Sequence, residues 1–273
     1  MKRLLFGLAM IALSTSANAQ DAAGKKYQAG LVTGFGMNFQ EMGTTRMASL
    51  GVGSDVTLGA NVNIGLTETI AFTTGAEFDF ERLRFNNGPN PVYYWYTDKQ
   101  ILQRGEVGNA TNPQLFQLIE RRQRVTYLTI PTMLMFRTNF IGYFRYFGKF
   151  GLRNSILLSN KYNDTGVNFE DMESPLGTPT QSLEQENMEA GGEMLIFKSA
   201  VGAAGGAEWN FIGSTCLVAE LGFYYGFTPL FLDRDEDKTT LFTSGANNGQ
   251  GNDIPFSNQA RQSQLMLKIS ILF

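Results

Sequence analysis

Apolar and polar residues alternate with a period of two along most of this chain, and no other feature constrains the fold as strongly. Successive side chains of a β-strand point to opposite faces, so this alternation indicates strands with one apolar and one polar face. Eight segments show the pattern: Tyr27–Phe39, Asp55–Leu66, Ile70–Phe85, Arg124–Arg137, Tyr143–Leu158, Leu195–Ala207, Cys216–Thr228 and Gln264–Phe273.

The connections between these segments alternate in length. Short ones fall near Thr67–Thr69, Asn139–Gly142 and Asn210–Ser214, and long polar ones fall near Glu41–Ser54, Asn86–Ile119, Lys161–Gly191 and Phe231–Arg261. Short turns on one side and long loops on the other are typical of outer-membrane barrels. The sequence therefore predicts an all-β fold: an eight-stranded antiparallel up-and-down transmembrane β-barrel with short periplasmic turns and long extracellular loops.

Two soluble folds share the same alternation. A β-sandwich lacks the strict order of short and long connections, and its outward face carries polar residues. A lipocalin-like barrel places the apolar face inside, whereas a membrane barrel places it outside. The N-terminal segment, the strand lengths and the terminal Phe273 favour the membrane barrel.

The first nineteen residues have the three parts of a secretory signal peptide. Lys2 and Arg3 precede an apolar run, and Ala17-Asn18-Ala19 supplies a small-residue cleavage site. We predict a signal peptide over residues 1–19 and a barrel domain over residues 20–273, located in the bacterial outer membrane. No later apolar run reaches the roughly 18 residues that a membrane-spanning helix needs.

Composition excludes several classes of function. The chain has no His and a single Cys, Cys216, which removes Ser-His and Cys-His pairs and imidazole metal sites. Its net charge of -3 shows no basic surplus, which argues against a nucleic-acid partner. We predict no enzymatic activity, no catalytic residue, no cofactor and no bound metal.

The polar faces of the predicted strands carry charges of both signs. A single charge inside a barrel is costly unless it is paired, so we interpret these residues as a mutually satisfied polar network that fills the lumen. Eight strands enclose an interior just filled by side chains. A gated conduit or a sensor with rearranging ion pairs is the alternative. The predicted network consists of Glu77, Asp79, Glu81, Arg145, Lys149, Arg153, Lys198, Glu220 and Lys268, with Asp55 near a rim.

Four consecutive aromatic residues, Tyr93, Tyr94, Trp95 and Tyr96, lie in a predicted loop. Because Tyr and Trp dominate binding hot spots, they form a candidate surface for recognition. The alternative is that the preceding hairpin extends past the membrane and the rings pack on it or join an aromatic girdle.

The final nine residues, Leu265 to Phe273, resemble the last strand of bacterial outer-membrane proteins, in which a terminal aromatic is the signal for the barrel-assembly machinery. Tyr127-Leu128-Thr129-Ile130-Pro131, followed by Tyr146, Phe150 and Gly151, resembles the PorT-like barrel family of Bacteroidota. The two resemblances together imply an outer-membrane barrel of the small OmpA/OmpX-like kind, and the first of them implies that Phe273 is the assembly signal.

The predicted function is a structural or interaction role. A subunit of a type IX-like secretion or envelope machine is a second hypothesis, because the PorT-like family includes such a component, and a narrow pore for small solutes is a third. The expected partners are outer-membrane lipid, the barrel-assembly machinery during biogenesis, and envelope or secretion-system proteins.

Overall fold

The computed structural model describes residues 26–169, 179–213, 215–244 and 253–273. The predicted signal peptide, residues 1–19, lies outside the described residues. Within these ranges the chain forms 14 β-strands and two short 3₁₀ helices, η2 (Arg104–Asn109) and η3 (Glu236–Lys238). None of the described helices is long and apolar enough to cross a membrane.

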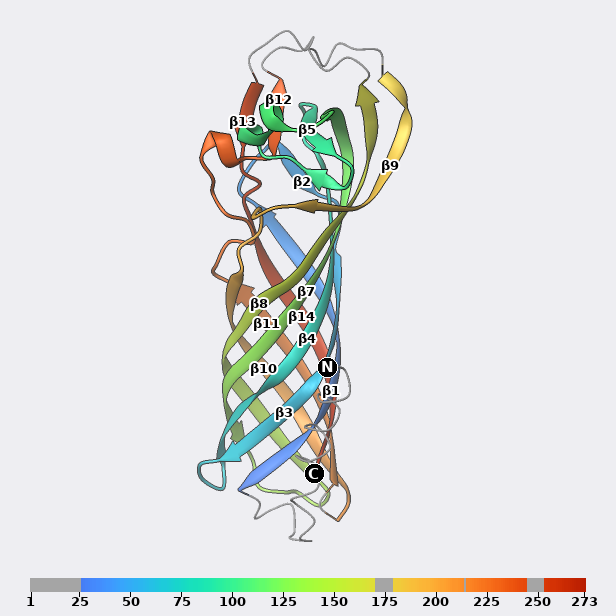
Figure 1. Cartoon of the computed structure of the whole chain (residues 1–273). Coiled ribbons are helices and arrows are strands. Elements are labelled where there is room, and N and C mark those ends of the chain that lie inside the picture. The colour runs from blue at the N-terminus through green and yellow to red at the C-terminus, as the bar shows by residue number, and fades with distance from the viewer. Residues whose placement is uncertain (1–25, 170–178, 214, 245–252) are drawn as a thin grey trace.

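Eight strands are paired antiparallel into a ring, and each contains most or all of one predicted segment (Figure 1). Following the pairings around the ring, β1 lies beside β3, then β4, β7, β8, β10, β11 and β14, and β14 pairs with β1 again. These strands are β1 (Tyr27–Met42), β3 (Gly53–Gly65), β4 (Ile70–Asn87), β7 (Gln114–Arg137), β8 (Phe144–Phe169), β10 (Phe197–Ile212), β11 (Thr215–Gly226) and β14 (Ala260–Leu272).

The predicted count of eight strands is wrong, because the long connections contain six more. These are β2 (Met47–Ser49), β5 (Val92–Thr97), β6 (Gln100–Ile101), β9 (Pro179–Ala190), β12 (Leu241–Ser244) and β13 (Asp253–Phe256). β7 pairs with β5 as well as with its ring neighbours, and β8 likewise pairs with β9. The sheet therefore branches at the end that carries the long connections and does not form a plain eight-stranded cylinder (Figure 1).

β7 has 24 residues and β8 has 26. A tilted strand needs only about 9–11 residues to cross the hydrocarbon core of a membrane. Both strands are therefore much longer than the predicted membrane crossing needs, and they continue into the wider part of the molecule.

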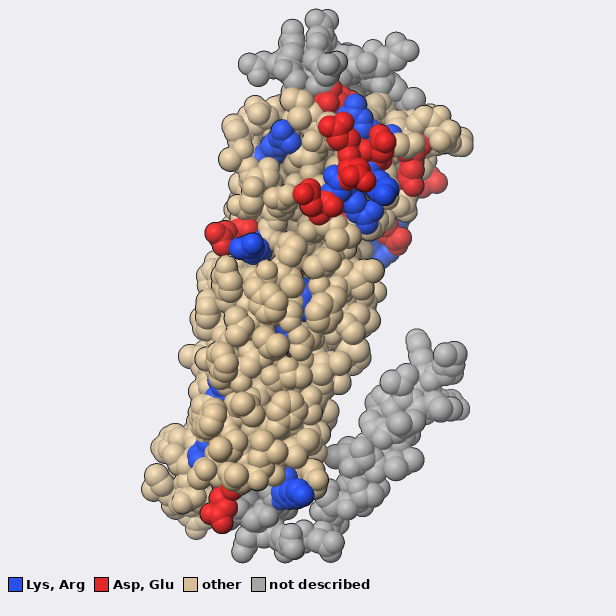
Figure 2. All heavy atoms as spheres, turned by 90° about the vertical axis from the view of Figure 1, so that its left-hand side faces the viewer, with Lys and Arg blue, Asp and Glu red and all other residues tan. Residues whose placement is uncertain are grey.

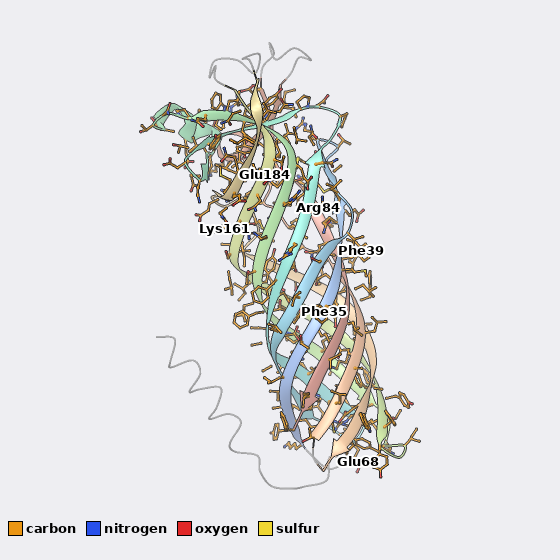
Figure 3. All side chains as sticks on the ribbon, turned by 90° about the vertical axis from the view of Figure 1, so that its right-hand side faces the viewer. Phe35, Phe39, Glu68, Arg84, Lys161 and Glu184 are labelled. Atoms are coloured by element: carbon orange, nitrogen blue, oxygen red, sulfur yellow. The ribbon has the colours of Figure 1, made fainter. Side chains whose placement is uncertain are left out.

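The lower part of the ring carries an outward apolar surface, which we call the apolar band. Figure 2 shows that Lys, Arg, Asp and Glu gather at the two ends of the visible face, above all at the upper end, with mostly uncharged surface between. In Figure 3, Phe35 and Phe39 lie below Arg84, and Glu68 lies at the opposite end, in a short turn. The band includes Leu31, Phe35, Met37, Val56, Leu58, Phe78, Phe80, Ile130, Leu134, Phe150, Leu152, Leu221, Phe223, Leu267 and Ile269, all exposed.

The interior changes character along the same strands. On β4 the inward residues Glu77, Asp79 and Glu81 are followed by inward Leu83 and Phe85. Leu83 and Phe85 belong to an apolar cluster at the upper end, which we call the head core. Its buried members are Met47, Leu83, Phe85, Val92, Tyr94, Tyr96, Ile101, Phe116, Leu118, Val125, Tyr127, Tyr162, Met188, Met194, Leu230, Phe231, Leu241, Phe256 and Ala260.

A β-bulge at Leu158 marks this change on β8. Tyr127 of β7 pairs with Leu157, but the next pair joins Thr126 to Ser159, so Leu158 has no partner in the β7–β8 ladder. An extra residue shifts the alternation of a strand by one. Odd-numbered residues such as Arg153 point inward before the bulge, and even-numbered residues such as Tyr162 point inward after it. Because of the bulge, the inward side chains of the second half of β8, such as Tyr162, point into the head core.

Candidate functional site

The lumen below the head core is crossed by polar side chains from all eight ring strands. At the end with the short turns, Arg145 forms a salt bridge of 2.6 Å with Glu208. Gln28 donates a hydrogen bond to the same carboxylate, and its own carbonyl oxygen accepts from Arg137 and Arg145. This group joins the starts of β1 and β8 to the ends of β7 and β10.

The next ion pair is formed by Lys149 of β8 and Glu220 of β11, whose charged atoms lie 2.5 Å apart. Tyr224 packs its ring near Arg153, with the guanidinium 4.9 Å from the ring centroid. The Tyr224 hydroxyl lies 3.5 Å from Glu220. These contacts cross the barrel between β8 and β11, which are not neighbours in the ring.

Arg153 and Lys268 share the carboxylates of β4. The Arg153 guanidinium lies 2.8 Å from Asp79 and 3.2 Å from Glu77, and Lys268 lies 2.7 Å from Glu77. Thr57 and Thr129 also donate hydrogen bonds to Asp79. Glu77 and Asp79 therefore each contact a cation, and the hydroxyls satisfy further carboxylate lone pairs.

Glu81 forms the uppermost layer of this network. It accepts hydrogen bonds from Lys198 at 2.5 Å, Gln264 at 2.9 Å and Gln262 at 3.1 Å. Asp55, expected near a rim, is instead buried beside this layer, where Gln264 donates to it at 3.4 Å. Asp55 takes part in no salt bridge among the described residues.

The structure thus places all nine residues of the predicted network inside the ring, each in at least one salt bridge. Sequence reasoning missed Glu208, the partner of Arg145. The predicted strand ends at Ala207, one residue before Glu208 and five before the end of β10, although alternation continues through Glu208 and Trp209.

This arrangement leaves little space for a solute at the upper layer. A cavity lined in part by Lys198, Gln262 and Gln264 measures about 10 Å³. About 10–15 Å³ is the least that holds one water molecule. Buried opposite charges at these distances stabilise the interior only as complete pairs, and removal of one partner is costly. The network therefore suits a rigid filling of the lumen.

A second charged cluster lies inside the head core, and the sequence pattern gave no indication of it. Arg121 of β7 donates three hydrogen bonds to Asp164 of β8, at 3.0, 3.2 and 2.8 Å, and lies 3.5 Å from Glu193. Its guanidinium lies 4.3 Å from the ring centroid of Tyr162 and 5.5 Å from that of Tyr94. Both Arg121 and Asp164 are almost completely buried.

Burial and charge pairing shift the pKa values of Arg121, Asp164, Tyr94 and Tyr162. Burial acts to lower the pKa of Arg121, but Asp164 and Glu193 together raise that pKa above its ordinary value. Burial raises the pKa of Asp164 above its ordinary value, although Arg121 opposes the shift. Burial also raises the pKa values of Tyr94 and Tyr162 well above their ordinary range, so both hydroxyls stay protonated.

The four consecutive aromatic residues are not a surface patch. Tyr93, Tyr94 and Tyr96 are buried and Trp95 is half-buried. Tyr94 and Tyr96 pack against Phe116 in the head core, and Tyr93 stacks on Phe242 at 5.8 Å between ring centroids. The candidate recognition surface is therefore wrong, and the rings pack on an extended part of the sheet, as in the alternative interpretation. β5 pairs with β7, and its alternate rings point into apolar clusters on either side.

Phe273 follows the end of β14. Its backbone exchanges hydrogen bonds with Ala29 of β1, and its side chain is exposed. The residue therefore lies where the last strand joins the first, at the end with the short turns (Figure 1).

Comparison with known proteins places this geometry among membrane barrels. A family model described as outer membrane protein beta-barrel domain matches residues 18–232, well over half of the chain. No curated protein matches the chain.

Three crystal structures of bacterial proteins are among those that align with the chain. Ail, the attachment invasion locus protein of Yersinia pestis, aligns with a TM-score of 0.33 and 10% identity over 91% of this chain and 100% of Ail. Neisserial surface protein A aligns with a TM-score of 0.32 and 8% identity over 91% of this chain and 98% of that protein. The outer membrane protease OmpT of Escherichia coli aligns with a TM-score of 0.30 and 7% identity over 95% of this chain and 99% of OmpT.

Proposed function

Because the chain belongs to the outer membrane protein beta-barrel domain family, we propose that it is a sealed outer-membrane barrel that holds a folded head outside the cell. In this proposal the eight ring strands cross the membrane, and the head performs a structural or interaction role. The short turns face the periplasm, and the six additional strands face outward, as long connections do in outer-membrane barrels.

One observation carries the proposal: side chains fill the interior of the ring, first as a network of ion pairs and then as an apolar core. Ion pairs from Glu208 up to Glu81 occupy the lower part, and the head core occupies the upper part. A general pore keeps a water-filled lumen, which needs more strands than a ring of eight provides. These features support a sealed barrel over the narrow pore for small solutes.

Planar lipid bilayers test the sealed lumen directly. The purified full-length protein is expected to insert without step increases in current, while a porin in the same bilayers gives them. Reproducible open-channel steps from the folded protein would contradict the proposal and favour the narrow pore.

The head's role is tested by crosslinking in cells. A photoreactive amino acid at Ile254, which is exposed on β13, probes the head, and one at Phe223, which is exposed on the apolar band, is the matched control. Capture of one reproducible set of proteins from Ile254 alone supports an interaction role. If that set consists of secretion or envelope subunits, the second hypothesis, a component of a type IX-like machine, takes precedence. Recovery of only abundant porins and lipoproteins from both positions supports a stand-alone structural barrel.

A further inference from the structure

Four arginines form a block on the outer surface of β4 and β7, directly above the apolar band. In the antiparallel register Arg82 pairs with Arg124, and Arg84 pairs with Arg122. Lys161 of β8 extends the row, because it lies opposite Arg124. Like charges directly opposite each other on a sheet are destabilising, so a bound anion would stabilise this surface.

Carboxylates of the chain neutralise only part of the block. Glu120 lies 2.9 Å from both Arg84 and Arg122, and Lys161 is paired with Glu189. Arg124 donates hydrogen bonds to the side chains of Asn163 and Asn187, which carry no charge. In the salt bridges of the described residues, Arg82 and Arg124 do not take part. Arg82 and Arg124 are therefore the two arginines of the block that form no salt bridge with a carboxylate of the described residues.

The side chains of the block line an open hollow on the surface. A cavity of about 490 Å³ is lined by all four arginines, by Asn163, and by Leu83 and Gln123. The arginines point outward, since Arg82, Arg84, Arg122 and Arg124 are all exposed whereas Leu83 and Gln123 between them point inward and are buried. The hollow is thus on the outside of the barrel, separate from the lumen.

The height of the block relative to the membrane identifies the kind of anion. On β4 the outward residues below Arg82 are Phe80 and Phe78, both exposed on the apolar band. One step of two residues along a strand is about 7 Å. In the proposed placement, the guanidinium groups therefore lie where the hydrocarbon of the membrane ends and lipid headgroups begin, and Figure 3 shows Arg84 above Phe35 of the apolar band.

We propose that this block, with Arg82 and Arg124 at its centre, binds the phosphate of a phosphorylated lipid in the leaflet next to the head. Arginine presents a planar fork of donors that matches phosphate oxygens in a bidentate way. The acyl chains of the same lipid lie against Phe78 and Phe80. The proposal rests on the membrane placement proposed above, with the head outside the cell, and is independent of whether the lumen is sealed.

A binding measurement with defined lipids tests this site. The probe is bisphosphorylated lipid A, and the comparison probe is the same lipid without its phosphates, each titrated into the full-length protein in neutral detergent. The test variant is Arg82→Gln/Arg124→Gln, which leaves the Glu120-paired arginines in place. The matched control is Lys99→Gln/Arg104→Gln, which removes the same charge from exposed residues of the head. Retention of the heat-dependent gel shift of folded barrels verifies folding of each variant.

The wild type and the control are expected to bind bisphosphorylated lipid A equally. The test variant is expected to bind roughly 25-fold more weakly, at about fivefold for each arginine near an anionic surface. Lipid A without phosphates is expected to bind no better to the wild type than to the variant. If Arg82→Gln/Arg124→Gln fails to fold, Arg82→Gln alone replaces it, with an expected weakening of about fivefold.

Three results would overturn the proposal. The first is equal affinity of the wild type and the test variant for bisphosphorylated lipid A. The second is equal affinity of the wild type for the lipids with and without phosphate. The third is competition by inorganic phosphate at the concentration at which lipid A binds, which would make the block a site for free anions in place of a lipid site.

Discussion

Glu81 and Leu83 lie two residues apart on β4 and point into the same interior, but their surroundings are opposite. Glu81 accepts hydrogen bonds from Lys198, Gln262 and Gln264, whereas Leu83 packs into the head core. On the outer side of the same strand, exposed Phe80 is followed by exposed Arg82. Up to Glu81, β4 therefore has the pattern of a membrane barrel, with apolar residues outside and polar residues inside. From Arg82 onward it has the reverse pattern, which is that of a water-soluble barrel.

The stability of the lumen network is expected to depend on whether each buried charge is paired, more than on how many charges are buried. Glu77→Gln removes the carboxylate that faces Lys268 and Arg153. Breaking a buried pair by removing one partner costs about 3–5 kcal/mol, because a charge is left uncompensated. The expected result is a loss of that size in the free energy of unfolding, measured by urea unfolding of the barrel in lipid vesicles.

Asp55→Asn is the matched control for this change, because Asp55 is similarly buried but takes part in no salt bridge among the described residues and accepts a hydrogen bond from Gln264. It is expected to change the free energy of unfolding by about 1 kcal/mol or less, since an amide replaces the carboxylate at nearly equal volume. A cost for Asp55→Asn as large as that for Glu77→Gln would show that pairing does not decide the stability of the lumen.

Lys149→Met is expected to destabilise the barrel without opening it. The substitution leaves Glu220 without its cation, while the Met side chain fills most of the space that Lys149 occupied. Urea unfolding should show a loss of about 3 kcal/mol or more, and planar bilayers should show no new current. Lys99→Met, in the exposed turn between β5 and β6, should affect neither measurement. Open-channel steps from folded Lys149→Met would argue that this pair is a gate.

Alternation of apolar and polar residues was sufficient to locate the ring, because each ring strand has one face toward lipid and one toward a polar lumen. The predicted segment Tyr143–Leu158 ends at the bulge residue of β8, beyond which the strand continues to Phe169. The bulge shifts the alternation by one residue, so a constant period of two cannot be followed across it. A second shift, between Leu118 and Glu120, interrupts β7 in the same way.

The head could not be predicted for a different reason. Its strands face water outside and an apolar core inside, so the polar residues of the long connections resemble those of ordinary loops. Tyr94 and Tyr96 show the consequence, because the sequence left open both a recognition surface and packing on an extended hairpin, and only the structure shows that the two rings are buried. Arg121 and Asp164 are 43 positions apart, and only the pairing of β7 with β8 brings them together.

Deletion of Leu158 is expected to unfold the head. Without the extra residue, the second half of β8 would keep the alternation of the first half, and Tyr162 and Asp164 would point outward. Limited proteolysis should then cut β8 and β9 rapidly, while the heat-dependent gel shift reports whether the membrane barrel still folds. Leu158→Ala keeps the extra residue and is the control, with wild-type resistance to protease expected. Protease resistance of the deletion variant equal to that of the wild type would show that the bulge does not determine which side chains of β8 point inward.

The buried cluster of the head gives the last prediction. Arg121→Met leaves Asp164 and Glu193 without a cation in an apolar core, and the loss of one partner from such a group costs about 3–5 kcal/mol. Replacing a complete buried pair with apolar residues is often neutral or stabilising, so Arg121→Met/Asp164→Leu is expected to recover a large part of that loss. Hydrogen exchange of the β7 and β8 amides in the head measures both effects, because local opening exposes them there first. Faster exchange in the double variant than in Arg121→Met would mean that Asp164 supports the head through contacts other than Arg121. Slower exchange in the double variant, with Arg84→Gln on the exposed face close to wild type, would show that the two residues act as a pair.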